Sequence, residues 1–181
     1  MEAITYVYLA GIDNSGPDHW QAMWHARSDN GVWVEHEAWE APVRDVWVKD
    51  LDDVLRSIEG PKVLIAHSLG CTVLTEWATE HQDEGVVGAL VVAMPDVHGS
   101  NFPKAALGFD VPRHGTLPFL TVVVASEDDP FGYSTPVDRQ AVAERLGAQL
   151  VEVGRKGHIN ASSGLGDWSE GWSIFGEHFL G

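Results

Sequence analysis

The sequence has only one cysteine, Cys71, so it can form no internal disulfide. Small secreted domains are commonly held together by several disulfides, and this chain does not fit that class. Residues 1–5 lack the basic region of a secretory signal, and no run approaches the roughly 18 apolar residues of a membrane span. We therefore expect a cytoplasmic protein that does not associate with membranes.

Basic side chains are also scarce in this sequence. Lysine and arginine number 11 against 27 aspartates and glutamates, which gives a formal net charge of -16 at pH 7. A field of this sign repels phosphate backbones, so we expect no nucleic-acid partner. With 44% hydrophobic and 21% charged residues, the composition predicts a single globular domain over residues 1–181. Nothing in it indicates an oligomeric state.

Short apolar runs alternate with stretches of helical spacing along the chain. This alternation is typical of an α/β fold, with a mostly parallel sheet and helices on both of its faces. Strands are expected at 4–10, 32–36, 62–66, 86–93, 119–125 and 149–153, and helices from Pro17 through Trp24, over 43–58 and 69–81, through 141–146 and over 167–180. Residues 95–118 are rich in glycine and proline and are predicted to form a long loop or a lid.

The most informative motif lies between the predicted strand 62–66 and the predicted helix 69–81. Ser68 has Ala66 two residues before it and Gly70 two residues after it. This is the A-x-S-x-G form of a nucleophile elbow, a turn so tight that only small residues fit at the flanking positions. We predict that Ser68 is a nucleophile and that the backbone N–H of Leu69 stabilises an oxyanion. A serine that merely caps the helix is the alternative.

A serine nucleophile needs a base and an acid that orients the base, and in hydrolases with such an elbow both follow in the order acid, then histidine. Asp128 and Asp129 follow the predicted strand 119–125, and His158 follows the predicted strand 149–153. We therefore predict a triad of Ser68, His158 and one of the two aspartates. Taken singly, the aspartates also suit a turn before proline and the histidine a structural role. These arguments do not separate Asp128 from Asp129.

Four segments together resemble a known family. They are Asp18–Trp24 after an early glycine turn, His67–Gly70, Asp128–Phe131 and Gly157–His158. They look like the small serine hydrolases related to retinoblastoma-binding protein nine, and the resemblance spans nearly the whole chain. It implies a compact α/β-hydrolase whose sheet lacks the first strands, and it assigns the triad acid to Asp129. Ala66 stands where many relatives carry glycine.

In the fold that this resemblance implies, a second oxyanion donor comes from the loop after the first core strand. Here that loop is 11–16, and we assign the donor to the backbone amide of Ile12; a glycine turn that simply reverses the chain is the alternative. His19 is expected to make a structural hydrogen bond, and His67 to support the elbow. His36 and Glu37 lack the second histidine of a metal-binding motif, so we expect no metal and no cofactor.

The function expected from these residues is hydrolysis of a small carboxylic ester through an acyl-enzyme. His158 would take the proton of Ser68, the amides of Leu69 and Ile12 would stabilise the oxyanion, and Asp129 would hold the imidazole. The alternative is a low-turnover binding or regulatory protein on a hydrolase scaffold, against which the intact serine, acid and histidine argue. No preference among esters, amides and thioesters follows from the sequence.

Overall fold

The computed structural model describes residues 3–81, 84–109 and 115–180. Its strands are β1 Thr5–Leu9, β2 Gly31–Trp33, β3 Lys62–His67, β4 Val86–Val92, β5 Leu120–Ala125 and β6 Gln149–Glu152. Its helices are α1 Trp20–Arg27, α2 Arg44–Ser57, α3 Leu69–Glu80, α4 Pro136–Leu146 and α5 Ser169–Phe179, with a short 3₁₀ helix η1 at Ala161–Ser163. Within the described ranges, no helix has both the length and the apolar character needed to cross a membrane.

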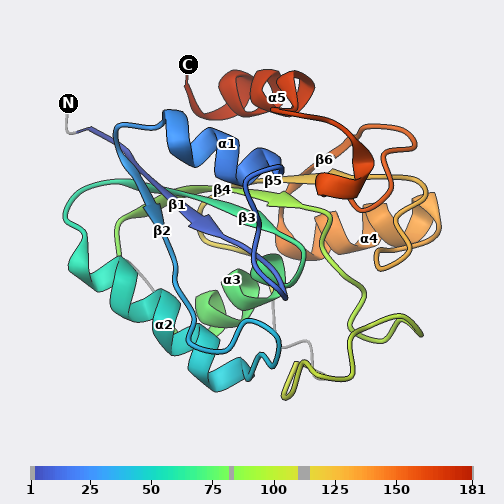
Figure 1. The fold of residues 1–181 in the computed structure, drawn as a ribbon, viewed down its shortest axis with the longest axis horizontal. Helices are drawn as coiled ribbons and strands as arrows, with labels where there is room; N and C mark the ends of the chain where they lie inside the picture. The colour runs from blue at the N-terminus through green and yellow to red at the C-terminus, as the bar shows by residue number, and fades with distance from the viewer. Residues whose placement is uncertain (1–2, 82–83, 110–114, 181) are drawn as a thin grey trace.

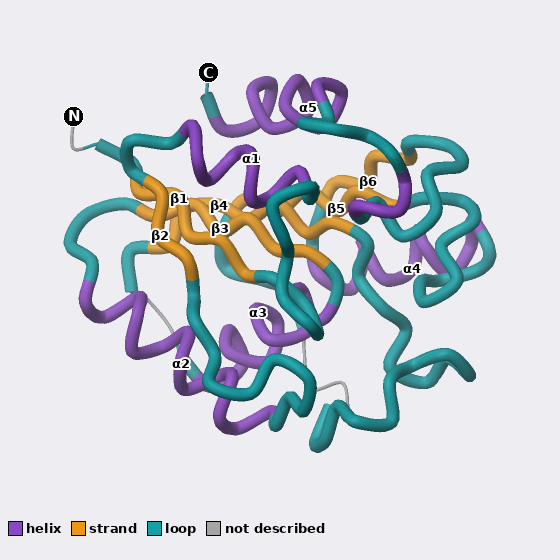
Figure 2. Tube along the Cα trace, in the orientation of Figure 1, coloured by secondary structure: helices purple, strands orange, loops and turns teal. Residues whose placement is uncertain are grey.

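The six strands form one parallel sheet in the order β2-β1-β3-β4-β5-β6. Helices α1 and α5 cover one face, and α2, α3 and α4 cover the other (Figure 1; the same arrangement is traced in Figure 2). The predicted α/β class with a parallel sheet and helices on both faces is therefore confirmed.

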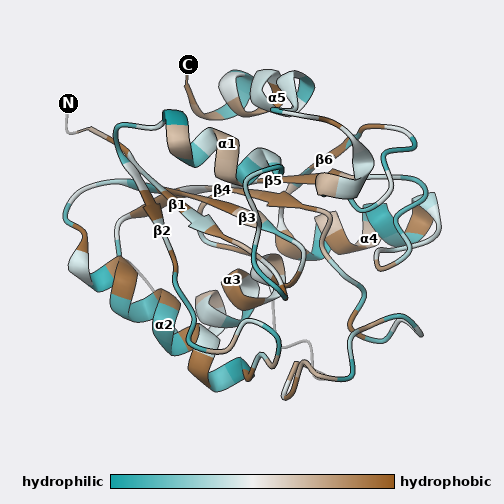
Figure 3. Ribbon diagram, in the orientation of Figure 1, coloured by the Kyte–Doolittle hydropathy of each residue, from teal (hydrophilic) through white to brown (hydrophobic). Residues whose placement is uncertain are grey.

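The central strand β3 shows why the sequence folds in this way. Val63 and Ile65 pack into the hydrophobic cluster under α1 and α5, whereas Leu64 and Ala66 pack into the cluster under α2 and α3. A strand that is covered on both faces needs apolar residues at consecutive positions. Figure 3 accordingly shows hydrophobic colours along the central strands and a mixture of hydrophobic and hydrophilic segments on α2.

The strand order reverses at β1, because β2 lies on one side of it and β3 on the other. The chain leaves β1 toward α1 on one face of the sheet and leaves β3 toward α3 on the opposite face (Figure 1). Such a reversal opens a crevice at the carboxyl ends of the two strands, where open α/β sheets bind ligands. The loop 11–16 and Ser68 both lie at this crevice.

Some predicted boundaries are wrong. Helix α1 begins at Trp20 instead of Pro17, because His19 caps it by accepting a hydrogen bond from the Gln21 N–H at 3.1 Å. Strand β2 ends at Trp33, and His36 beyond it bonds to Asp50 and stacks on Trp47. The predicted helical residues 141–146 lie within α4, which begins at Pro136, and η1 was not predicted.

The predicted loop or lid 95–118 is described at 95–109 and 115–118, and contains no helix or strand there; residues 110–114 lie outside the described residues. Its first half is tied to the rest of the fold at several points. The Asp96 N–H donates to the Phe131 carbonyl at 2.9 Å, and the Asn101 side chain donates to the Pro130 carbonyl at 2.8 Å. Leu107 forms a bridge with Val43. These bonds place the first half of the segment beside the loop that follows β5.

Candidate active site

Ser68 lies in a strained turn between β3 and α3, with φ 54° and ψ -126°. A non-glycine residue with positive φ costs on the order of 1–3 kcal/mol and persists only where its surroundings impose it. Here the Ser68 N–H donates to the Val92 carbonyl at 3.0 Å, and the Ser68 carbonyl accepts from the Cys71 N–H at 2.9 Å. Neighbouring backbone thus holds the serine at the carboxyl edge of the sheet.

The turn also depends on close packing of Gly70 against β1. A Cβ atom on Gly70 would lie 2.4 Å from the Leu9 carbonyl oxygen and 2.9 Å from that of Ala10. Both contacts are with backbone, which cannot move aside cheaply. The small residue that the elbow motif requires after the serine is therefore explained by the approach of α3 to β1.

Gly70→Ala is expected to lower the free energy of unfolding by about 2 kcal/mol or more, because overpacking against fixed backbone is destabilising. Gly16→Ala is the matched control, since a Cβ there meets nothing within 4 Å; we expect it to change stability by less than about 0.5 kcal/mol. Urea denaturation of both variants measures the difference. Equal urea midpoints for Gly70→Ala and the wild type would show that the close packing of Gly70 against β1 does not restrict this position.

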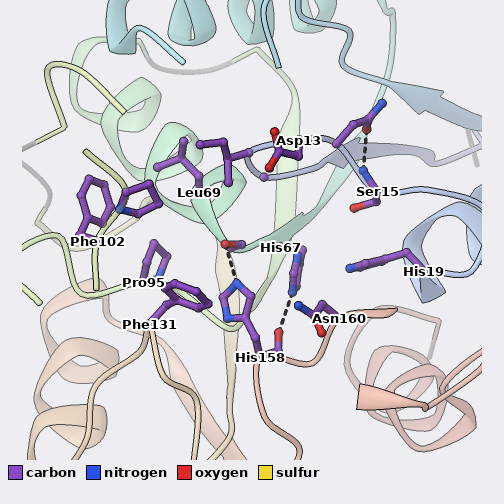
Figure 4. A pocket seen from close by; sticks show the side chains of 15 residues that line it. Asp13, Ser15, His19, His67, Leu69, Pro95, Phe102, Phe131, His158 and Asn160 are labelled. Atoms are coloured by element: carbon purple, nitrogen blue, oxygen red, sulfur yellow. Dashed lines mark hydrogen bonds between the residues drawn. The ribbon is translucent and has the colours of Figure 1, made fainter. Parts of the chain in front are cut away.

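His158 joins Ser68 to Asp129 in one hydrogen-bonded chain. The Ser68 hydroxyl lies 2.7 Å from Nε2 of His158, and Nδ1 of His158 lies 2.8 Å from Oδ1 of Asp129 (Figure 4 shows the serine contact). Because a carboxylate accepts but does not donate, the ring proton is on Nδ1, and Nε2 is free to accept the hydroxyl proton. The Asp129 side chain is 4% exposed, and its Oδ1 also accepts from the Phe131 N–H at 3.0 Å.

The neighbouring Asp128 has a different set of contacts. Its Oδ1 accepts from the Gly157 N–H at 2.8 Å and from the Ser126 hydroxyl at 3.0 Å, and its Oδ2 lies 3.6 Å from Arg155. The Gly157 amide, with help from Ser126 and Arg155, lowers the pKa of Asp128 below its usual value. Asp128 therefore ties the loop after β5 to the loop that carries His158, whereas Asp129 contacts the imidazole itself.

Two further histidines, His67 and His19, are packed next to His158 in a row. Nε2 of His67 donates to the backbone carbonyl of His158 at 2.9 Å, and the two rings are 5.0 Å apart. Burial, together with repulsion from His19 and His158, lowers the pKa of His67 well below its usual value, so its ring is neutral. His67 thus connects the elbow strand to the backbone of the His158 loop, and His19 packs edge-on against it with ring centroids 4.6 Å apart.

His19 gives the protein a specific pH dependence. It is 4% exposed, and burial followed by repulsion from His158 lowers its pKa from 6.5 to about 4. The unfolded chain therefore binds a proton below pH 6.5 that the folded chain refuses, so stability falls as the pH drops from 6.5 to 4, by up to about 3 kcal/mol from this group. His19→Asn preserves a helix cap and should flatten this decline in thermal denaturation. Part of the decline remains in this variant, because burial also lowers the pKa of His67 and of His36. If stability falls with pH as steeply in His19→Asn as in the wild type, His19 is not its source.

The two predicted oxyanion donors, the amides of Ile12 and Leu69, border the same cavity as Ser68. Neither amide donates to a protein acceptor among the residues described. Gly11 lets the β1 loop approach this closely, because a Cβ on it would lie 2.9 Å from Cβ of Ser68 and 3.2 Å from the Leu69 nitrogen. Ile12 and Leu69 thus both line the cavity in front of Ser68, and neither backbone N–H has a protein acceptor among the described residues.

The cavity in front of Ser68 has a volume of about 250 Å³ (Figure 4). It is lined by Gly11, Ile12, Asp13, Asn14, Ser15, His19, His67, Ser68, Leu69, Pro95, Phe102, Pro103, Phe131, His158 and Asn160. The motifs did not reveal the wall residues Asp13, Phe102, Phe131 and Asn160. Their signals were indirect, since each lies on a loop: Asp13 after β1, Phe102 on the loop 95–118, Phe131 after β5 and Asn160 after β6. Within the described ranges, no group of three or more His, Cys, Asp or Glu side chains is placed to hold a metal ion.

A family model described as serine hydrolase matches residues 6–177 of this chain. Among curated proteins, no sequence is significantly similar to this one.

Several solved structures have a similar fold. A protein described as a YdeN-like hydrolase from Pectobacterium atrosepticum has a TM-score of 0.86 and 28% identity, over 97% of this chain and 90% of that one. The ydeN gene product of B. subtilis has a TM-score of 0.77 and 19% identity, over 99% and 100%. An epoxide hydrolase of the α/β-hydrolase superfamily, from metagenomes of hot environments, has a TM-score of 0.69 and 13% identity, over 99% and 91%. The predicted compact α/β-hydrolase fold is confirmed.

Proposed function

Because the chain belongs to the serine hydrolase family, we propose that it hydrolyses small carboxylic esters through a Ser-His-Asp triad and an acyl-enzyme intermediate. The observation that carries the proposal is the unbroken chain of hydrogen bonds from Asp129 through His158 to Ser68, at 2.8 and 2.7 Å. The strained backbone of Ser68 and the presence of Ile12 and Leu69 in the wall of the same cavity support the same conclusion.

In the proposed mechanism, Ser68 attacks the ester carbonyl carbon while Nε2 of His158 takes the hydroxyl proton. The amides of Leu69 and Ile12 stabilise the oxyanion of the tetrahedral intermediate. His158 then gives its proton to the leaving alcohol oxygen, and the acyl group remains bound to Ser68. Water, activated by the same imidazole, attacks this acyl-enzyme and releases the acid. Asp129 keeps the imidazole in the required tautomer throughout.

The size of the cavity supports a small substrate. A volume of about 250 Å³ suits an acyl chain of a few carbons, and the loop 95–109 closes one side through Pro95, Phe102 and Pro103. The side chains of Pro95, Phe102 and Pro103 carry no hydrogen-bonding group, so acyl chains are bound there by burial of apolar surface.

The purified protein assayed on p-nitrophenyl esters of increasing chain length tests this proposal. We expect turnover to be highest for short and medium acyl chains and to fall for long ones, with thioesters and amides as parallel series. Folded protein that turns over none of the three series would contradict the proposal. That result would favour the alternative, a binding or regulatory protein that retains the scaffold.

A further inference from the structure

Asp13 is the only Asp, Glu, Lys or Arg among the described residues that line the cavity in front of Ser68. It follows Ile12, which supplies one of the proposed oxyanion amides. Its side chain is exposed, and it forms no ion pair with any residue that the structure describes. From this placement, and resting on the proposed ester hydrolysis, we propose that Asp13 selects esters whose acyl part carries a positive charge, such as a quaternary ammonium group.

The loop holds Asp13 in a fixed conformation. Asp13 and Asn14 both have φ 64°, and the Asp13 N–H donates to the Trp39 carbonyl at 2.9 Å. Oδ1 of Asn14 accepts from the Ser15 N–H at 2.8 Å and from the Trp33 indole at 3.2 Å. Two successive residues in the left-handed region are held by these bonds, so Asp13 stands on a structured turn in the cavity wall.

The position of Asp13 determines which part of the substrate it faces. In Figure 4, Asp13 and Leu69 lie on the side of the cavity away from His158. Because His158 must reach the leaving oxygen to protonate it, the alcohol part of an ester lies on the His158 side. The acyl part then occupies the side that Asp13 borders.

The charged residues around the cavity do not neutralise the negative charge of Asp13. The segment 34–43, which follows β2 on the carboxyl side of the sheet, contains Glu35, Glu37 and Glu40 but no lysine or arginine. In the adjoining outer groove, Arg155 pairs with Asp128 and Lys156 with Glu170. Lys104 follows the wall residue Pro103, but it does not line the cavity. The histidines His19 and His67 are neutral at pH 7, so no cation in the cavity wall offsets the carboxylate.

A matched pair of esters tests the inference. The p-nitrophenyl ester of 4-(trimethylammonio)butanoate carries a fixed cation, and that of 5,5-dimethylhexanoate replaces its nitrogen with carbon and keeps the shape. We expect Asp13→Asn to lower the ratio of kcat/KM for the charged ester over the neutral ester by about three- to tenfold. The readout is this ratio rather than either rate alone, because any effect of the substitution on the oxyanion site changes kcat/KM for both esters together; asparagine tolerates positive φ, so the turn itself is preserved. Asp18→Asn, an exposed aspartate outside the cavity lining, controls for the change in net charge.

Salt gives an independent readout. Raising NaCl from about 0.05 to about 0.5 M should reduce the charged-to-neutral ratio in the wild type and leave it nearly constant in Asp13→Asn. A ratio that is the same in the wild type and Asp13→Asn, or that falls equally in Asp18→Asn, overturns the inference but leaves ester hydrolysis intact. Folded wild type that hydrolyses short acyl esters but neither ester of this pair overturns this inference alone, whereas folded wild type that hydrolyses no ester overturns the proposed function and this inference with it.

Discussion

Ser68→Ala is expected to lower kcat/KM for short acyl esters by about 10⁴-fold or more. The reason is that no other hydroxyl group lies within hydrogen-bonding distance of Nε2 of His158 among the described residues. The remaining activity would come from the amides of Ile12 and Leu69 and from binding in the cavity, which accelerate attack by water only modestly. Steady-state assays of the purified variant measure the effect.

Ser134→Ala is the control for this substitution. Ser134 is exposed and does not line the cavity, so its loss should leave turnover unchanged. Circular dichroism of both variants checks that each is folded. A folded Ser68→Ala variant with turnover close to that of the wild type would exclude Ser68 as the nucleophile.

Asp129→Asn is expected to lower kcat by about 10⁴-fold with little change in fold. An asparagine amide next to Nδ1 of His158 favours the tautomer with its proton on Nε2, and that tautomer cannot accept the hydroxyl proton of Ser68. The imidazolium that forms during the reaction also loses the buried carboxylate that stabilises it. Measurement of kcat on a short acyl ester tests this.

Asp128→Asn separates the two adjacent aspartates. Its Oδ1 can still accept from the Gly157 N–H and the Ser126 hydroxyl, so the loop keeps its two short bonds. Only the partly exposed ion pair with Arg155 is lost, and such pairs contribute little, so we expect less than about a tenfold change in kcat. A large loss in Asp128→Asn with nearly normal turnover in Asp129→Asn would reverse the assignment of the two residues.

The sequence predicted the sheet well because its central strands are buried on both faces. Consecutive apolar residues such as those from Val63 to Ala66 are readily recognised, and all six strands lie close to their predicted positions. The residues at which helices begin were harder to predict. His19 is not a usual capping residue, so nothing local indicated that α1 begins after it. The family resemblance is confirmed at the level of a small serine hydrolase of the α/β-hydrolase superfamily, whereas the link to retinoblastoma-binding protein nine stays a prediction.

The candidate site also has a part that the sequence predicts and a part that it does not. The elbow at Ser68 and the order of the acid and the histidine can be read from the sequence, because the spacing itself reflects the geometry of the turn. The choice between Asp128 and Asp129 could not be made from the residues alone, since it depends on which carboxylate faces Nδ1 of His158 across 29 residues of chain. The sequence indicated a role for the loops 11–16 and 95–118 but not the individual wall residues Asp13 and Phe102, because the course of each loop is set by tertiary hydrogen bonds.

Covalent labelling with a fluorophosphonate probe tests the central claim most directly. Such probes react with a serine only when a base and an oxyanion site activate it. Mass spectrometry of the digested wild type should show one adduct, on the peptide that contains Ser68, and none in Ser68→Ala or in protein unfolded in urea. Folded wild type that stays unlabelled, or an adduct on another serine, would contradict the account.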